Sequence, residues 1–321
     1  MAPPILVGYD PATRDRAPVQ FGAELGRYGG ARLIVASVHG TVRSIGLSAG
    51  QTLPFALVRA DEDLVADCGP ELWQLAEELE EQGVQAECRA LPGASVARAL
   101  HEAAEAEQAG TIVVGSSRRS GVGRVLAGST AQRLLHGAPC AVAVVPQRWT
   151  RDDEERPIGV AFVDTPDGHD ALRAGLLLAR RAGAALRVIH VVRATAEMYT
   201  ETESYTAGQR GKYFEDVLGE HALEAIRAMR KAIADLDPGD VPIDVDAFVD
   251  DPAETLIHLS QSLRLLVCGS RGYGPARAVL LGGVSRKLVA VARCPVIVLP
   301  RGRASSLETV VSEHAVRAEA I

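Results

Sequence analysis

Short apolar runs alternate with amphipathic stretches along this 321-residue chain, which is the pattern of buried strands separated by surface helices. In the first half, five runs have the length and aliphatic content of buried strands: Ile5–Asp10, Leu33–Val38, Val84–Leu91, Thr111–Val114 and Ala141–Val145. The spacing of apolar residues predicts helices between them over Ala17–Arg27, Pro70–Glu80, Ser95–Gln108 and Ala131–His136. Residues 39–68 are too irregular to assign to one element.

The same order of elements returns in the second half. Strands are predicted over Ile158–Val163, Leu186–Val192, Ile243–Val249, Leu265–Cys268 and Val296–Leu299. Helices are predicted over Asp170–Arg181, Tyr213–Asp235, Pro252–Gln261 and Val284–Ala292. Residues 147–156 are polar, dense in charge and bounded by prolines, which is typical of a linker.

A constant offset relates the two halves. Gly115 and Gly269 follow the fourth predicted strand of each half and lie 154 residues apart, and Asp10 and Asp164 at the ends of the first strands show the same offset. The chain is therefore a duplication. Strands joined by helices in this order form parallel sheets through right-handed crossovers. We expect an α/β fold of two tandem Rossmann-like, doubly wound domains, each a five-stranded parallel sheet with helices on both faces.

The predicted domain boundaries follow from the repeat and the linker. The first domain takes residues 1–146, the linker 147–156, the second domain 157–300 and a C-terminal tail 301–321. The sequence leaves two interpretations of the tail open, a disordered segment or a weak helix that docks on a partner.

Composition and charge narrow the classes of function. A net charge of −7 and a pI of about 5.7 argue against a nucleic-acid partner. No apolar run approaches the ~18 residues of a membrane span and no leader is evident, so we expect a cytoplasmic protein with no membrane partner. The five cysteines form no C-x-x-C pair and are interpreted as small buried hydrophobes in a reducing compartment. Motifs of P-loops, serine hydrolases and zinc proteases are absent from the sequence.

In each half a glycine-bearing loop connects the fourth strand to the last helix. Such a loop aims backbone N–H groups at one point and suits a phosphate. Ligands of doubly wound sheets bind beyond the carboxyl ends of the strands, where both loops are predicted to lie. The alternative is that the loops are only tight connections inherited with the fold, and that Asp10 and Asp164 only cap helices.

With these features the chain resembles the universal stress protein family in its tandem, two-domain bacterial form. The resemblance rests on the family pattern G-x2-G-x9-G-[ST], which each half matches at all but one position, after the acid that ends the first strand. It implies that this acid and the end of the second strand hold adenosine, while the loop and the next helix hold phosphates. The implied nucleotide-binding residues are Asp164, Val191, Gly269, Gly272, Gly282, Gly283, Val284 and Ser285, and in the first half Asp10, Val38, Gly115, Gly128, Ser129 and Thr130.

Both halves depart from the family pattern. Arg118 replaces the second glycine of the first loop, where its side chain takes space or supplies charge to phosphate. Gly283 replaces the hydroxyl residue of the second loop, and Phe162 stands where the first half has Gly8 and would crowd an adenine. We expect the second half to be the main nucleotide site.

The resemblance implies a stress-response regulator that binds ATP, with or without Mg²⁺. Because the loop has no obvious general base or nucleophile beside it, we expect the protein to be non-catalytic or at most a slow ATPase, with no catalytic or metal-binding residues. A scaffold that has lost nucleotide is the alternative, and a slow ATPase is a third interpretation. The implied assembly is a homodimer in which the two halves of each chain are related by an internal pseudo-twofold axis.

Overall fold

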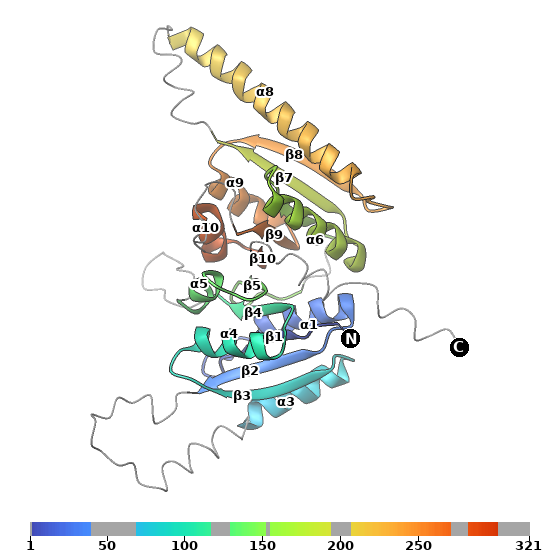
Figure 1. The fold of residues 1–321 in the computed structure, drawn as a ribbon, viewed down its shortest axis with the longest axis vertical. Coiled ribbons are helices and arrows are strands. Elements are labelled where there is room, and N and C mark those ends of the chain that lie inside the picture. The colour runs from blue at the N-terminus through green and yellow to red at the C-terminus, as the bar shows by residue number, and fades with distance from the viewer. Residues whose placement is uncertain are drawn as a thin grey trace, which may run out of the picture. The chain divides into compact units, whose positions relative to one another are not determined.

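The chain forms two compact units, one within residues 2–151 and one within residues 155–300 (Figure 1). The structure is a computed structural model, and it describes residues 2–39, 69–116, 129–151, 155–193, 207–270 and 282–300. The predicted tail 301–321, the irregular stretch 40–68 and the loop residues Arg118, Gly128 and Gly272 lie outside the described residues.

The first unit is a parallel sheet with the strand order β3-β2-β1-β4-β5. Its strands are β1 (Ile5–Gly8), β2 (Leu33–His39), β3 (Ala86–Pro92), β4 (Thr111–Gly115) and β5 (Ala141–Val145). Its described helices are α1 (Ala17–Gly29), α3 (Gly69–Glu81), α4 (Val96–Ala106) and α5 (Ser129–Leu135).

The second unit repeats this topology with the order β8-β7-β6-β9-β10, again parallel throughout. Its strands are β6 (Ile158–Ala161), β7 (Leu186–Val192), β8 (Ile243–Val249), β9 (Leu265–Gly269) and β10 (Val296–Leu299). Its described helices are α6 (Pro166–Ala182), α8 (Ala207–Ala234), α9 (Pro252–Leu259), the short 3₁₀ turn η2 (Ser260–Ser262) and α10 (Gly283–Val291). The predicted fold class is confirmed.

Helices cover both faces of each sheet because neighbouring strand residues point to opposite faces. In β1 the side chain of Val7 faces Gly22 of α1, whereas Gly8 faces Leu100 of α4. The chain order of the strands reverses on the two sides of β1, so the carboxyl ends of β1, β2 and β4 flank a topological switch point.

The prediction that α6 begins at Asp170 was wrong by one turn. The helix begins at Pro166, and the Thr165 hydroxyl accepts a hydrogen bond from the Gly168 N–H at 3.2 Å. A hydroxyl residue followed by proline is a standard helix start, and the apolar spacing alone did not reveal it. Gly168 is required in this first turn, because a Cβ there would lie 1.9 Å from the carbonyl oxygen of Val163.

The central strand of each unit, β1 or β6, lies against a glycine of the helix that follows it, α1 or α6. A Cβ on Gly22 would come within 2.6 Å of Val7 Cγ2, and a Cβ on Gly175 within 2.2 Å of Val160 Cγ2. Real side chains do not approach so closely, so the helices sit near the sheet only because these positions carry no side chain.

The cysteine interpretation holds for three of the residues. Cys140, Cys268 and Cys294 are buried. Burial raises the pKa of both the Cys268 and the Cys294 thiol to about 12, so these groups stay protonated at neutral pH. They behave as small hydrophobic side chains.

The helix–sheet contact at Gly175 predicts a stability effect. Gly175→Ala should lower the free energy of unfolding of the second unit by about 1–3 kcal/mol, because the added methyl group overlaps Val160. Gly219→Ala in α8 is the matched control, since among the residues that the structure describes a Cβ there meets no atom within 4 Å. This control should gain up to about 1 kcal/mol from helix propensity. Denaturant unfolding monitored by circular dichroism measures both, and equal midpoints would contradict the proposed contact.

Candidate functional site

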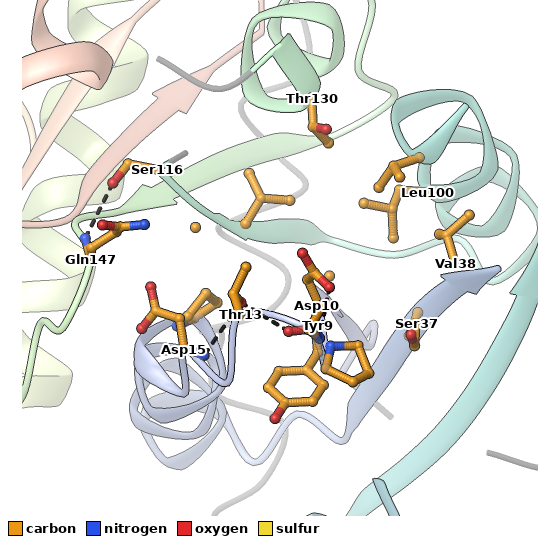
Figure 2. A pocket seen from close by; sticks show the side chains of 18 of the residues that line it. Tyr9, Asp10, Thr13, Asp15, Ser37, Val38, Leu100, Ser116, Thr130 and Gln147 are labelled. Atoms are coloured by element: carbon orange, nitrogen blue, oxygen red, sulfur yellow. Dashed lines mark hydrogen bonds between the residues drawn. The ribbon is translucent and has the colours of Figure 1, made fainter. Parts of the chain in front are cut away.

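Two cavities of about 610 Å³ each open at equivalent places in the two units. The first is lined by the ends of β1, β2 and β4 and by residues of α4 and α5 (Figure 2). The second is lined by the ends of β6, β7 and β9 and by residues of α9 and α10. Both therefore lie at the carboxyl edge of a parallel sheet, where doubly wound folds bind ligands.

The first cavity brings together most of the residues predicted for the first half. Asp10, Val38, Gly115 and Thr130 all line it, from four different elements or their ends (Figure 2). The side chain of Ser129 is not among those described, although its backbone begins α5. Gly115 lies close to the start of α1, because a Cβ added to Gly115 would be 3.2 Å from Pro18 Cγ.

Asp10 organises the loop after β1 and does not cap a helix. Its Oδ1 accepts a hydrogen bond from the Ala12 N–H at 3.0 Å, and Arg16 occupies the N-cap position of α1. The Thr13 hydroxyl donates to the Asp10 carbonyl oxygen at 2.9 Å (Figure 2). The capping alternative is therefore wrong for Asp10, whose exposed carboxylate lines the cavity.

The second cavity brings together six of the residues predicted for the second half, while Gly272 lies outside the described residues. The lining includes Val191, Gly269, Gly282, Gly283, Val284 and Ser285. Gly283 is the first residue of α10, and a Cβ there would meet no atom of the described residues within 4 Å. The helix thus begins at the cavity with room beside it for a ligand or a larger side chain.

Asp164 is the predicted residue that does not line the second cavity. Its Oδ1 lies 2.8 Å from Nε2 of His169, and its side chain is 67% exposed. Thr165, the next residue, is the N-cap of α6, so Asp164 does not cap this helix either. Counted from the matching helix glycines Gly22 and Gly175, the residue of the first half equivalent to His169 is Arg16, whose guanidinium pairs with Glu78.

Ser285 is buried, and its hydroxyl already has a partner. Its Oγ donates to the carbonyl oxygen of Gly269 at 3.1 Å, which ties the first turn of α10 to the end of β9. The equivalent residue of the first half is Ala131, which is also buried. Ser285 must therefore break this hydrogen bond before its hydroxyl can donate to a phosphate.

The prediction that Phe162 stands in the place of Gly8 was wrong: the strand register matches Gly8 with Ala161, and Phe162 with Tyr9. The Phe162 ring is 2% exposed and packs edge-on against His169 with a centroid distance of 5.4 Å. Although Phe162 lines the cavity, the volume equals that of the first cavity. His190 fixes the backbone beneath it, with Nδ1 3.0 Å from the Phe162 carbonyl oxygen, and burial lowers the pKa of this imidazole.

Sequence reasoning missed a cluster of charged residues at the second cavity. Arg193, Asp251 and Lys287 line it, and the Arg193 guanidinium contacts Asp251 Oδ2 at 3.1 Å. Asp251 is the N-cap of α9, where its Oδ1 accepts from the N–H groups of Ala253 at 3.0 Å and Glu254 at 3.1 Å. The run Asp-Pro-Ala-Glu at 251–254 was a visible capping signal.

The described linings of the two cavities differ in charge. The second contains three cations, Arg193, Arg286 and Lys287, with Asp251 as its acid. The described lining of the first contains Asp10 and Asp15 but neither lysine nor arginine. Coulombic attraction therefore favours a phosphorylated ligand in the second cavity more than in the first.

Two other classes of site find no support in the described part of the chain. Its residues contain no group of three or more His, Cys, Asp or Glu placed to hold a metal ion. None of the helices that the structure describes is both long enough and apolar enough to cross a membrane.

Comparisons with known proteins agree with the duplicated architecture. The sequence model of the Universal stress protein family matches residues 1–146 and again residues 155–300. A universal stress protein of Mycobacterium tuberculosis is 29% identical over 195 residues, a match that spans 60% of this chain and 62% of the relative's length. One of Mycolicibacterium smegmatis is 28% identical over 306 residues, spanning 92% and 96%. The crystal structure of a universal stress protein from Archaeoglobus fulgidus shares the fold, with a TM-score of 0.59, 18% identity and coverage of 93% and 96%.

The cap of α9 at the edge of the second cavity predicts a pH-dependent stability. The N–H of Glu254, with that of Ala253, lowers the pKa of Asp251, and Lys287 and Arg193 act in the same direction. The carboxylate therefore stabilises the fold fully above its unfolded pKa of about 3.9, and this contribution is lost as pH falls through the lower folded value. Asp251→Ala should lower the free energy of unfolding by about 0.5–2 kcal/mol at pH 7.

Asp251→Asn is the control for this prediction, because it keeps the oxygen acceptor and loses the charge. Its deficit relative to the unchanged protein should shrink as the pH is lowered below about 4. Urea unfolding across a pH series measures the deficit, and a gap that is independent of pH would contradict the electrostatic part of the argument.

Proposed function

This chain belongs to the universal stress protein family, and we propose that it is a regulatory protein that binds an adenine nucleotide and has no catalytic activity of its own. The proposed ligand is ATP, with or without Mg²⁺. Binding would change which conformation or partner surface the protein presents, as expected of a stress-response regulator.

The observation that carries this proposal is the pair of equal cavities at the carboxyl edges of the two sheets. In each, the glycine that ends the fourth strand and the first turn of the next described helix line the same space. The unpaired N–H groups of a helix N-terminus attract anions such as phosphates. The end of the second strand, Val38 or Val191, supplies an apolar side chain on the opposite side of the switch point.

The second cavity is proposed as the main site for the phosphates of ATP. Its described lining holds Arg193, Arg286 and Lys287, and α10 begins with Gly282 and Gly283 beside open space. The first cavity is proposed to hold the adenosine part of a nucleotide more strongly than its phosphates. There the Asp10 carboxylate is in the lining and can accept hydrogen bonds from ribose hydroxyls.

The resemblance to the family also supports a cytoplasmic homodimer. Sedimentation of the purified chain tests the proposed assembly directly, because a dimer has twice the monomer mass of 33.9 kDa. A monomeric mass with and without ATP would overturn the proposed assembly and would leave nucleotide binding untouched.

Equilibrium dialysis against ATP tests the proposed function on protein from which bound nucleotide has been stripped. Saturable binding at or below cellular ATP concentrations is expected, and mass spectrometry of the nucleotide that survives a mild purification identifies the natural ligand. If the protein binds none of ATP, ADP, AMP or adenosine, it acts as a scaffold through its surfaces. If phosphate is released steadily and release is lost in site variants, the protein is a slow ATPase.

Gly283→Ser should tighten ATP binding about three- to tenfold. The substitution restores the hydroxyl that Ser129 provides in the first half, and the open space around Gly283 accommodates it. One additional hydrogen bond to a charged group, offset by ordering of the serine, accounts for this gain.

Gly283→Ala is the matched control, because it adds the same Cβ without a hydroxyl. It should bind ATP as the unchanged protein does, and isothermal titration compares all three. If serine and alanine tighten binding equally, helix propensity explains the gain. If both weaken binding, the phosphates do not lie at the start of α10.

A further inference from the structure

We propose that occupancy of the first cavity is transmitted to the segment that leads from the first unit toward the second, through hydrogen bonds of Asp15 and Ser116. The segment in question is the turn at residues 146–149, called here the exit turn. This inference rests on the proposed binding of an adenine nucleotide or nucleoside and assigns a regulatory consequence to it.

The exit turn follows β5 directly and has a conformation that needs support. The N–H of Trp149 donates to the carbonyl oxygen of Pro146 at 3.2 Å, which closes a four-residue turn. Arg148, the third residue of the turn, has a φ of 55°, in the left-handed region that non-glycine residues rarely adopt. Such a residue keeps this conformation only where neighbouring contacts hold it.

Two hydrogen bonds hold the exit turn, and both acceptors belong to the lining of the first cavity. The N–H of Gln147 donates to Ser116 Oγ at 3.2 Å, and the N–H of Arg148 donates to Asp15 Oδ1 at 3.4 Å. Ser116 and Asp15 line the cavity, and so does Gln147 itself. Figure 2 shows Gln147 joined to Ser116 on one side of the cavity, with Asp15 nearby.

The same carboxylate is connected to the loop that carries Asp10. Asp15 Oδ1 also accepts from the Ala17 N–H at 3.2 Å, and the Asp15 N–H donates to Thr13 Oγ1 at 3.3 Å. Thr13 Oγ1 in turn donates to the Asp10 carbonyl oxygen at 2.9 Å. Hydrogen bonds therefore connect the backbone of the proposed ribose-binding residue, through Thr13 and Asp15, to the exit turn. Figure 2 shows the part from Asp10 to Asp15.

An aromatic contact anchors the far side of the turn. The ring of Trp149 packs edge-on against Phe21 of α1, with centroids 5.4 Å apart and an angle of 88° between the rings. Phe21 is 1% exposed, so the partially exposed Trp149 ring reports on whether the turn stays docked against the core of the first unit.

A ligand in the first cavity acts on this arrangement by contacting its polar side chains. Hydroxyl and amino groups of an adenine nucleotide that hydrogen-bond to Asp10 and Gln147 favour the docked turn over alternatives in which Arg148 leaves the left-handed region. The ligand shifts the equilibrium only to the extent that it binds the docked form more tightly. In the second unit, the residue equivalent to Asp15 is Gly168, which has no side chain that could accept such hydrogen bonds.

The first experiment tests the support of the turn without any ligand. Amide hydrogen exchange at Gln147 and Arg148 should be at least tenfold faster in Ser116→Ala and in Asp15→Ala than in the unchanged chain. Thr150→Ala is the matched control, because the exposed Thr150 follows the turn directly. Exchange that is as slow in both variants as in the control would overturn the inference.

The second experiment measures transmission in the full chain with Trp149 as the fluorescent reporter. Trp73→Phe removes the other tryptophan, which is 59% exposed on α3. Titration with ATP or adenosine should change the Trp149 emission to a saturating value, and Asp10→Ala should move the midpoint at least tenfold higher. At equal occupancy, measured by dialysis, Ser116→Ala and Asp15→Ala should lose most of the emission change.

The possible results separate this inference from the proposed function. If dialysis finds no bound nucleotide or nucleoside, the proposed function fails and the inference fails with it. If dialysis finds binding while the Trp149 emission stays constant, only the inference fails. An emission change that survives in both variants at equal occupancy would show that another route carries it, which also overturns the roles assigned to Asp15 and Ser116.

Discussion

The close approach of one helix to the central strand is the constraint on which the rest of each unit depends. Gly22 lets α1 lie against Val7, and Gly175 lets α6 lie against Val160. A larger residue would push the helix outward and would move the loop that precedes it, which lies at the switch point of the sheet. Each cavity is bounded by that loop on one side, so its shape is a consequence of packing at a distance from it.

The two units keep this frame and differ in the polar groups placed upon it. In the first, the carboxylates of Asp10 and Asp15 accept hydrogen bonds from backbone N–H groups of the loop after β1, and the described lining is acidic. The second has cations in its lining and an aspartate that caps α9. Its Ser285 hydroxyl donates a hydrogen bond to the carbonyl oxygen of Gly269 at the end of β9. Duplication thus supplied two copies of one scaffold, and electrostatics rather than fold distinguishes what they can bind.

Much of the fold was predictable, because aliphatic runs such as Ala141–Val145 and Leu186–Val192 have few ways to be buried other than in a covered parallel sheet. Local hydrogen bonding was harder to foresee. The start of α6 depends on the Thr165 hydroxyl, and the orientation of Asp164 depends on a histidine five residues away. The sequence shows that Ser285 carries a hydroxyl, but not that this hydroxyl donates to the carbonyl oxygen of Gly269. The pairing of Arg148 with Asp15 joins residues 133 positions apart, beyond any local pattern.

The contact between Asp164 and His169 lowers the apparent affinity of the second cavity for any ligand that binds through the Asp164 carboxylate. Such a ligand binds only those molecules in which the hydrogen bond between His169 and Asp164 is broken. Its apparent Kd equals the intrinsic Kd divided by the fraction of these molecules. At Asp10 the internal partner is the Ala12 N–H and not a histidine. Two cavities of the same size can therefore differ in the concentration at which one and the same ligand fills them.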